Sequence, residues 1–234
     1  MNKEEFLEEL KKLNIELDED KLKRLNKYYE LLIEWNQKIN LTSITEKEDV
    51  YLKHFYDSLT LIKAINLSDS ISLCDIGTGA GFPGLVLKIC FPNLNVTLVD
   101  ALDKRIKFLN QVIEELKLEN IIAIHARAEE YAKNNREKFD VVTSRAVAKL
   151  NILNELCIPM VKVNGYFIPM KANIEKEVDD SLKSLDILNS KIESIFSFDL
   201  PKEKSIRNII KIKKEGTTNK KYPRNFGKIS KNPL

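Results

Sequence analysis

Two periodicities of apolar residues divide the chain into an N-terminal helical part and a longer alternating part. Apolar residues recur at helical spacing over about residues 3–13 and 20–35, and a third helical stretch is expected over about 46–65. From residue 71 onward, short apolar runs typical of buried strands alternate with amphipathic runs typical of helices. This alternation predicts a parallel, doubly wound α/β sheet that binds ligands at the carboxyl ends of its strands.

The elements of the alternating part follow from these runs. The expected strands are 71–76, 96–100, 121–125, 139–143 and 166–170, and the expected helices are 85–91, about 103–117, about 148–157 and about 174–188. Residues 126–129 are expected to form a polar turn. The β-rich runs 192–198 and 206–212 leave little room for a helix between them, so they predict a closing antiparallel hairpin.

We therefore expect three parts: an N-terminal helical extension (1–66), a sheet domain (67–214) and a C-terminal tail (215–234). The polar stretch between Trp35 and Thr42 is expected to end the second helix and form a turn or the cap of the next helix. Trp35 and Phe55 are interpreted as core residues, and His125 as a hydrogen-bonded core histidine. Because the tail contains glycine and proline, it is expected to be irregular and partly mobile.

The segment 71–84, ISLCDIGTGAGFPG, is typical of a strand that leads through a glycine-rich turn into a helix. Gly77, Gly79 and Gly81 allow the backbone to adopt positive φ and to approach a ligand closely. Pro83 suits the first turn of a helix, whose free amides attract polar or anionic groups. The segment therefore predicts a ligand-binding turn at the end of the first strand.

Two cofactor classes compete for this turn. Gly79, Gly81 and Gly84 satisfy the dinucleotide pattern G-x-G-x-x-G, and an acidic residue, Asp100, follows about 20 residues later. However, the Asp75 carboxylate would face a dinucleotide pyrophosphate with like charge, whereas it suits the cationic groups of S-adenosylmethionine. The closing hairpin also disfavours a dinucleotide fold. We favour S-adenosylmethionine, with Asp100 on the ribose hydroxyls, and an NAD-dependent oxidoreductase is the alternative.

Composition and charge narrow the function further. The three cysteines contain no C-x-x-C pair, and no Cys/His cluster is present, so neither a disulfide framework nor a metal site is expected. No run of about 18 apolar residues and no signal-peptide pattern occur, which indicates a cytoplasmic protein. A monomer is expected, because nothing in the sequence suggests an obligate partner.

The net charge of +3 is unevenly distributed. Residues 201–234 hold nine Lys and two Arg against two Glu, a net charge of +9, whereas residues 1–200 hold 27 basic and 33 acidic residues, a net charge of −6. A basic tail of this kind suits a phosphate backbone. A tail that only improves solubility is the alternative, and a methyltransferase acting on protein or a small molecule is less favoured.

The assembled motifs resemble those of the glucose-inhibited division protein B family, the bacterial small-subunit ribosomal RNA methyltransferases that modify a guanine at N7. The resemblance covers nearly the whole chain. It is carried by Trp35-Asn36 with Asn40-Leu41-Thr42, His54-Phe55 with Asp57-Ser58, the segment 75–84, Asp100, Arg127-Ala128-Glu129, Ser144-Arg145-Ala146, Lys171, and the tail segments 222–224 and 231–234.

The resemblance implies that the substrate is guanine 527 of 16S ribosomal RNA, free or within the small ribosomal subunit. It also implies cofactor contacts at Gly77, Phe82, Ala128, Glu129 and Arg145, beside Asp75, Gly79, Gly81 and Asp100 from the reasoning above. We assign Arg145 and Asn40 as candidate catalytic residues that hold the base or its phosphate, and Lys171, Lys220, Lys221 and Arg224 as RNA-binding residues. A non-catalytic RNA-binding module is a further alternative.

Overall fold

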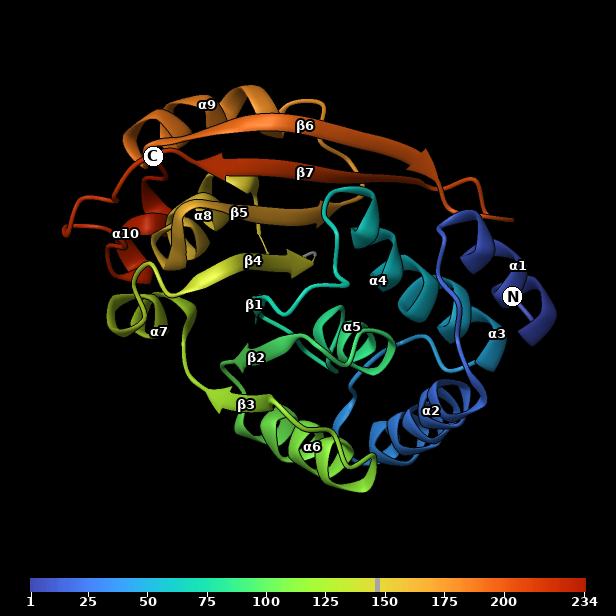
Figure 1. Cartoon of the computed structure of the whole chain (residues 1–234). Helices are drawn as coiled ribbons and strands as arrows, with labels where there is room; N and C mark the ends of the chain where they lie inside the picture. Colours follow the sequence, from blue (N-terminus) through green and yellow to red (C-terminus); the bar gives the residue numbers. More distant parts are fainter. Residues whose placement is uncertain (146–147) are drawn as a thin grey trace.

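A seven-stranded sheet crosses the molecule in the computed structural model, with helices on both faces (Figure 1). The structure describes residues 1–145 and 148–234, so Ala146 of the predicted motif lies outside the described residues. The strand order is β3-β2-β1-β4-β5-β7-β6. The strands are β1 (Ser72–Ile76), β2 (Asn95–Asp100), β3 (Ile121–His125), β4 (Phe139–Arg145), β5 (Val161–Lys171), β6 (Ser190–Asp199) and β7 (Ile206–Lys214).

The pairing of these strands confirms the predicted parallel sheet and its closing hairpin. β1 to β5 pair in parallel, and β7 lies antiparallel between β5 and β6. The strand order reverses between β1 and β4, because β2 lies on one side of β1 and β4 on the other. In open α/β sheets such a reversal leaves a crevice at the carboxyl ends of the strands. The glycine-rich turn after β1 lies at this reversal.

The helices form two layers, one on each face of the sheet. The first layer contains α1 (Lys3–Lys12), α2 (Glu19–Ile39), a helical segment made of α3 (Lys47–Val50), η1 (Tyr51–Tyr56), α4 (Asp57–Leu59) and η2 (Thr60–Lys63), then α5 (Gly84–Cys90) and α6 (Asp103–Glu115). The second contains α7 (Ala128–Asn134), α8 (Leu150–Cys157), η3 (Ile158–Met160), α9 (Glu177–Ile187) and α10 (Phe226–Lys231).

Apolar side chains of one strand point alternately to the two faces of the sheet, which explains why helices cover both faces. Leu73 packs in the core of the first layer, and its neighbour Cys74 packs in the core of the second. Leu98 and Val99 divide in the same way. Because successive strand residues point to opposite faces, a continuous apolar strand must be buried on both sides. The N-terminal helices therefore share one core with the sheet.

The end of α2 differs from the prediction. The helix continues through Trp35 and ends at Ile39, and Asn40 forms its C-cap in the left-handed region with φ of 47°. Trp35 is only half-buried, and its Nε1–H donates to Gln111 Oε1 on α6 at 2.9 Å. This contact to another helix supports the extra turn, which local sequence did not indicate. Phe55 is fully buried, as predicted.

Two other expectations about local structure were wrong. The predicted polar turn at 126–129 contains the start of α7, which begins at Ala128. This helix has seven residues, too few to show a clear helical period. His125 at the end of β3 is exposed, not a core histidine, and its Nε2 lies 3.0 Å from the carbonyl oxygen of Ala101.

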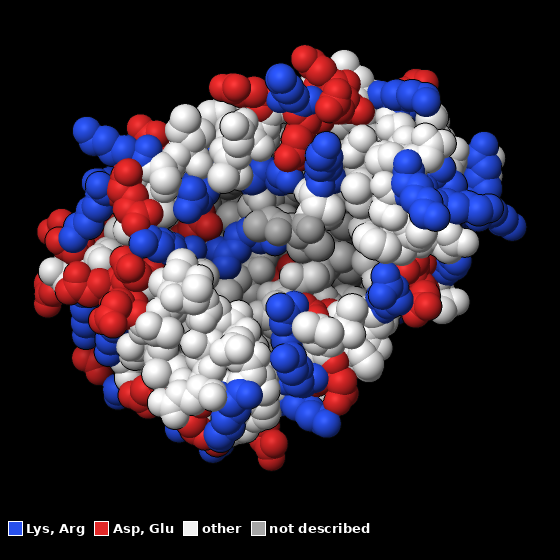
Figure 2. All heavy atoms as spheres, turned by 180° about the vertical axis from the view of Figure 1, so that it is seen from behind, with Lys and Arg blue, Asp and Glu red and all other residues white. Residues whose placement is uncertain are grey.

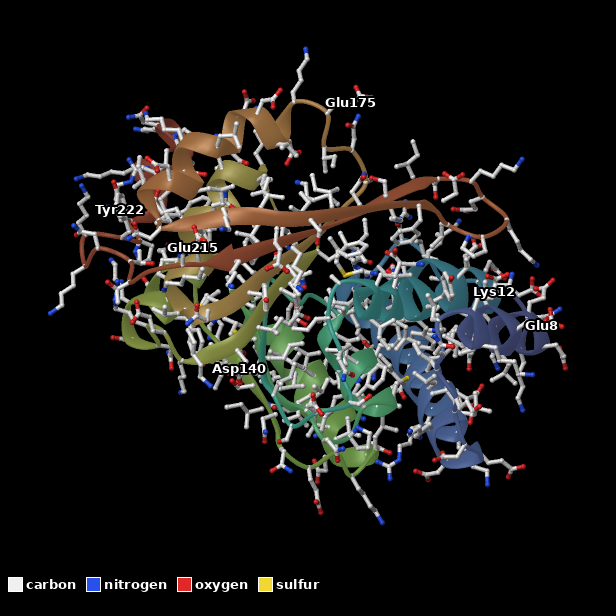
Figure 3. All side chains as sticks on the ribbon, turned by 45° about the horizontal axis from the view of Figure 1, so that its top comes forward. Glu8, Lys12, Asp140, Glu175, Glu215 and Tyr222 are labelled. Atoms are coloured by element: carbon white, nitrogen blue, oxygen red, sulfur yellow. The ribbon has the colours of Figure 1, made fainter. Side chains whose placement is uncertain are left out.

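The tail is irregular up to residue 225, as predicted, but it ends in the short helix α10 and packs against the body of the protein. Asn225 caps α10, and Ile229 of that helix is fully buried. Tyr222 is also buried and lies at the end of the molecule opposite to α1, which carries Glu8 and Lys12 (Figure 3). Burial of these side chains stabilises the docked position of the tail.

A buried ion pair anchors the tail. Arg224 donates from Nε and Nη2 to the carboxylate of Glu155, which is completely buried in α8, at 2.8 and 2.7 Å. The backbone N–H of Arg224 donates to the same carboxylate at 2.8 Å. The Arg224 guanidinium is therefore engaged within the protein, and its assignment to RNA stays a prediction.

We expect Arg224→Ala to lower the free energy of unfolding by about 3 kcal/mol, because it leaves the Glu155 charge buried without its partner. Urea denaturation followed by circular dichroism measures this change. Replacing both Lys220 and Lys221 with alanine is the matched control, since both side chains are exposed. That control should keep its stability and lose RNA affinity. Equal stability of the Arg224 variant and the wild type would contradict the anchoring role.

Candidate functional site

The glycine-rich turn is held by the backbone of the neighbouring strand. The N–H groups of Gly77 and Thr78 both donate to the carbonyl oxygen of Val99 on β2, at 2.9 and 3.1 Å. Gly77 and Gly79 have φ of 69° and 61°, which non-glycine residues rarely adopt. The turn therefore presents bare backbone at the carboxyl ends of β1 and β2.

Asp75 holds this turn by hydrogen bonds from two of its residues. Its carboxylate is completely buried, and Oδ2 accepts from Thr78 Oγ1 at 2.7 Å and from the Gly84 N–H at 2.9 Å. Oδ1 has no hydrogen-bond partner among the described residues. Burial raises the pKa of Asp75 to about 6, against hydrogen bonds from Thr78 and Gly84 that lower it. Asp75 thus joins the end of β1 to the start of α5.

Asp100 lies at the other side of the turn. Its Oδ2 accepts from the Gly79 N–H at 2.9 Å, and its Oδ1 accepts from the Leu102 N–H at 2.9 Å. Arg105 forms an ion pair with Oδ2 at 3.1 Å. Carboxylate oxygens have further lone pairs, so Asp100 can accept hydrogen bonds from ligand hydroxyl groups while it keeps these contacts.

A cavity of about 470 Å³ connects these groups. Its size lies within the range of small-molecule sites. The cavity lies between the glycine turn, Asp100 at the end of β2 and Arg145 at the end of β4. Its lining residues are Leu41, Thr42, His54, Gly77, Thr78, Gly79, Ala80, Phe82, Asp100, Ala101, Leu102, Arg105 and Arg145.

The cavity suits S-adenosylmethionine. The open backbone at Gly79, where an added Cβ would meet nothing closer than 4.0 Å, leaves room for a ligand against the turn. The Asp100 carboxylate can receive ribose hydroxyl groups. Asp75 is buried behind the turn and does not line the cavity, so its predicted role toward the cationic groups of the cofactor stays a prediction. Gly77, Gly79, Phe82, Asp100 and Arg145 would hold the cofactor.

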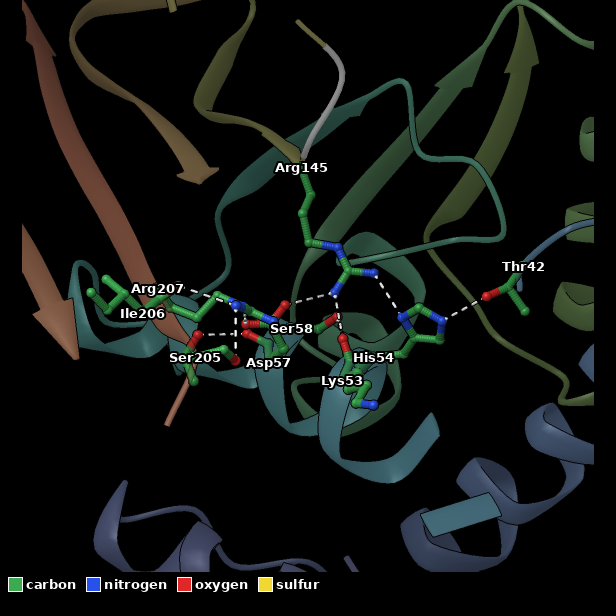
Figure 4. Close-up of polar contacts among 10 residues, drawn as sticks. Thr42, Lys53, His54, Asp57, Ser58, Arg145, Ser205, Ile206 and Arg207 are labelled. Carbon is green, nitrogen blue, oxygen red and sulfur yellow. Dashed lines mark hydrogen bonds and ion pairs between the residues drawn. The ribbon is translucent and has the colours of Figure 1, made fainter. Parts of the chain in front are cut away.

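Arg145 is the centre of a polar network at the end of β4 (Figure 4). Its Nη1 donates to Asp57 Oδ2 at 3.1 Å and to the carbonyl oxygen of Lys53 at 3.3 Å, and its guanidinium lies 5.1 Å from the centre of the Phe82 ring. Asp57 Oδ1 accepts in turn from Arg207 Nε on β7 at 3.2 Å. The network therefore joins the N-terminal helical segment to both β4 and the closing hairpin.

His54 extends this network into the cavity. Its ring stacks on Phe82 with centroids 4.4 Å apart, its Nδ1 lies 3.3 Å from Arg145 Nη2, and its Nε2 lies 2.9 Å from Thr42 Oγ1. Burial lowers the pKa of His54 to about 3, and the positive charge of Arg145 adds to this effect. The imidazole is therefore neutral near pH 7.

The other predicted site residues lie outside the lining of this cavity. Ala128 and Glu129 begin α7, next to the end of β3, and the nearby Ala126 N–H donates to the Asp100 carbonyl oxygen at 3.1 Å. Glu129 is buried and accepts from Arg127 Nε at 2.8 Å. Their assignment to the cofactor stays a prediction. Asp75 and Gly81 support the turn from behind.

The candidate catalytic residue Asn40 and the predicted RNA contact Lys171 lie outside the cavity lining, and both assignments stay predictions. Asn40 caps α2, and its neighbours Leu41 and Thr42, not Asn40, line the cavity. Lys171 is largely buried, with Nζ 2.8 Å from Glu177 Oε2 and 2.7 Å from the Ala148 carbonyl oxygen that it donates to. Its ammonium therefore has internal partners. Lys220 and Lys221 are exposed and stay predicted RNA contacts.

Sequence reasoning did not assign a role to Thr42, His54, Asp57 or Arg105. The first three occur in the motifs Asn-Leu-Thr and His-Phe-x-Asp-Ser, which were quoted without an individual function. The spacing of His54 and Asp57, three residues apart on a helical segment, places both on one face and was the available signal. Arg105 follows Asp100 by one helical turn and had no distinguishing pattern.

One face of the molecule is hollowed and carries basic side chains (Figure 2). Figure 2 shows Lys and Arg side chains around a hollow near the centre of one face. Such a face suits a polyanionic partner. Within residues 1–145 and 148–234, no group of His, Cys, Asp or Glu has the arrangement of a metal site. The described helices include none long and apolar enough to cross a membrane.

We expect Asp100→Ala to weaken the binding of S-adenosylmethionine at least tenfold, because charge-assisted hydrogen bonds are worth about 1.5–3 kcal/mol each. Isothermal titration calorimetry measures the affinity. Asp103→Ala is the matched control, since Asp103 lies on the same stretch, is exposed and pairs with Lys107 at 2.8 Å. Equal affinities of the two variants would remove Asp100 from the site.

Comparisons with known proteins agree with this geometry. Two solved structures share the fold: M. jannaschii TYW2 in complex with AdoMet (TM-score 0.57, 14% identity, covering 74% of this chain and 79% of that chain) and Aeropyrum pernix fibrillarin with natively bound S-adenosyl-L-methionine (TM-score 0.51, 12% identity, covering 63% and 68%). At these identities the likeness establishes the fold alone.

The sequence comparisons cover more of the chain. The protein-family model described as rRNA small subunit methyltransferase G matches residues 21–207. Proteins named ribosomal RNA small subunit methyltransferase G from Bacillus licheniformis and Lysinibacillus sphaericus are 51% and 50% identical to this chain, and the alignments cover all of it and 99% and 100% of those proteins. The chain therefore belongs to the rRNA small subunit methyltransferase G family.

Proposed function

We propose that this protein transfers a methyl group from S-adenosylmethionine to N7 of a guanine in 16S ribosomal RNA, within the cytoplasm. The observation that carries the proposal is the cavity, which combines a glycine turn and an acidic strand end with a buried arginine network. Relatives named for the small-subunit ribosomal RNA support the substrate. The AdoMet complexes of proteins with the same fold support the cofactor.

The residues of the cavity suit this reaction because it needs no general base. When bound, S-adenosylmethionine supplies an electrophilic methyl group. Guanine N7 carries a lone pair and no proton, so the protein has no proton to remove. The neutral His54 is already engaged on both ring nitrogens, and Asp75 is buried. Alignment of the base and the cofactor is therefore the main contribution of the site.

The basic surface supports an RNA partner. Lysine and arginine side chains surround the hollow seen in Figure 2, and each neutralised phosphate would release counterions. Lys220 and Lys221 add exposed positive charge on the docked tail. We therefore propose that the partner is 16S ribosomal RNA, free or assembled in the small subunit, and that RNA affinity falls as salt concentration rises.

The test is the transfer of labelled methyl from S-adenosylmethionine to small-subunit RNA that lacks its native methylation. Free RNA and assembled subunits are assayed separately, and the RNA is digested to nucleosides. A labelled 7-methylguanosine peak is the expected result. If neither substrate gained label although calorimetry showed cofactor binding, the RNA substrate would be wrong and the fold and cofactor would stand.

A further inference from the structure

The hydroxyl group of Thr42 occupies a defined position in the wall of the cavity. Thr42 lies between α2 and α3, and its backbone N–H donates to Asn36 Oδ1 at 2.8 Å. Its Oγ1 lies 2.9 Å from His54 Nε2 and accepts from the Ile44 N–H at 3.0 Å. The side chain is therefore held from three directions.

The neighbours of His54 determine which of its ring nitrogens carries the proton. A guanidinium group can donate but cannot accept hydrogen bonds. The contact from Arg145 Nη2 to Nδ1, at 3.3 Å, therefore favours the tautomer in which Nδ1 is the acceptor and carries no hydrogen. Since the ring is neutral, its hydrogen is on Nε2, and Nε2–H donates to Thr42 Oγ1.

Thr42 Oγ1 thus accepts two hydrogen bonds, one from His54 and one from Ile44. A hydroxyl oxygen has two acceptor positions and one hydrogen to donate. Both acceptor positions are occupied, and the described residues supply no acceptor for the hydrogen. The stack of His54 on Phe82 restrains the ring that sets this arrangement. The hydroxyl hydrogen is therefore available to a ligand in the cavity.

We propose that the Thr42 hydroxyl donates a hydrogen bond to O6 of the target guanine and thereby positions that base and selects it against adenine. This inference rests on the proposed function. Guanine presents N7 and O6 as adjacent acceptors on one edge, whereas adenine presents an N6 amino donor in place of O6. N7 must keep its lone pair for the methyl group, so O6 is the acceptor that remains for a protein donor.

The occupied lone pairs explain the selection. An ordinary hydroxyl group can rotate to accept from an amino group, and it would not distinguish the two bases. Thr42 Oγ1 cannot do so, because His54 and Ile44 already fill its acceptor positions. An adenine at this place would leave two donors facing each other, and a site that hydrogen-bonds one substrate rejects the analogue that cannot pair.

The position of Thr42 favours the base over the cofactor as the acceptor. Thr42 belongs to the connection between two N-terminal helices, not to the strand ends that carry the glycine turn and Asp100. In α/β sheets of this kind, cofactors bind at the strand ends. A segment added to the sheet and lining the same cavity is placed to contact the second reactant.

The test combines a protein variant with a base that lacks O6. Small subunits are reconstituted with 16S RNA that carries guanosine or 2-aminopurine riboside at the methylated position. 2-Aminopurine keeps N7 and lacks O6. For each substrate, kcat/KM is measured with the wild type and with Thr42→Val, so that intrinsic differences between the bases cancel in the ratio.

We expect Thr42→Val to lower kcat/KM about tenfold more on guanosine than on 2-aminopurine, because only guanosine loses the hydrogen bond to O6. A smaller loss common to both bases would come from the His54 Nε2–H and Ile44 N–H groups that lose their acceptor. Thr42→Ser, which keeps the hydroxyl group, should restore activity on guanosine. Thr45→Val, the same chemical change at an exposed position of the same connection, is the matched control and should have no effect.

Two results would overturn the proposal. Equal losses on guanosine and on 2-aminopurine would show that Thr42 acts only through the shape of the cavity. A loss of S-adenosylmethionine affinity in Thr42→Val, measured by calorimetry, would assign the hydroxyl group to the cofactor. Failure of the wild type to methylate guanosine at all would instead refute the proposed function, and this inference with it.

Discussion

Replacing Gly81 with alanine is expected to lower the free energy of unfolding by about 3 kcal/mol. Gly81 has φ of 100°, and an added Cβ would lie 2.5 Å from Leu85 Cδ1 and 2.7 Å from the Tyr28 hydroxyl oxygen. Overpacking costs about 1–3 kcal/mol and a strained backbone conformation a similar amount. Tyr28 would be displaced from its hydrogen bond to the Ala80 carbonyl oxygen, which links α2 to the turn.

Gly79→Ala is the matched comparison for this prediction. Gly79 has φ of 61°, but an added Cβ would have no neighbour closer than 4.0 Å. The substitution should lower the free energy of unfolding only by the cost of placing alanine in the left-handed conformation, about 1–2 kcal/mol. Because Gly79 lines the cavity, the variant should stay folded and bind S-adenosylmethionine more weakly.

Urea denaturation and calorimetry distinguish the two glycines. Gly81→Ala should show the larger loss of stability, and Gly79→Ala should show the loss of cofactor affinity in a folded protein. Equal stabilities of the two variants would mean that Leu85 and Tyr28 move aside at little cost. The dense packing seen behind Gly81 would then not be what requires glycine there.

The second large effect is expected for Arg145→Lys, which should reduce kcat/KM at least a hundredfold. Arg145 reaches Asp57, the Lys53 carbonyl oxygen and His54 with two nitrogens of one planar group. A lysine has a single nitrogen and cannot meet all three. Displacing a positioning group by about 1 Å can lower the rate about a hundredfold, which sets the size of the expected loss.

Arg207→Lys is the control that distinguishes an effect of this network on stability from an effect on methyl transfer. Arg207 contacts the other oxygen of Asp57, at 3.2 Å, and is not part of the cavity lining. We expect this variant to lower stability and to keep most of the methyl transfer of the folded protein. If Arg145→Lys and Arg207→Lys lost activity equally, the role of Arg145 would be to hold the fold, and its assignment to the site would be wrong.

Local patterns were sufficient to predict the parts of the fold that depend on neighbouring residues. A stretch of about ten residues is enough to recognise the buried strands, the glycine turn before α5 and the final hairpin, because apolar periodicity and glycine content are local properties of the sequence. Asp100 was placed correctly at the cavity for the same reason, since a strand end after a glycine turn has a predictable position.

Short or docked elements were beyond such patterns. α7 has seven residues and α10 six, and each is stable only because it packs on the rest of the protein. Arg224 illustrates this dependence, because its partner Glu155 lies 69 residues away in sequence. The tail is mostly irregular, as expected, but burial of Ile229 and the ion pair hold it against the protein in a way that the local sequence did not indicate.

The sheet, its glycine turn and the class of reaction were predictable because they follow from periodicity and from motifs of adjacent residues. Which polar groups meet at the cavity depends instead on contacts between distant parts of the chain. Arg145 contacts Asp57 across 88 residues, and Asp57 contacts Arg207 across 150. These partners are set by the packing of the N-terminal helices and the hairpin against the sheet. The proton on His54, and hence the direction of the Thr42 hydroxyl, depends on that packing.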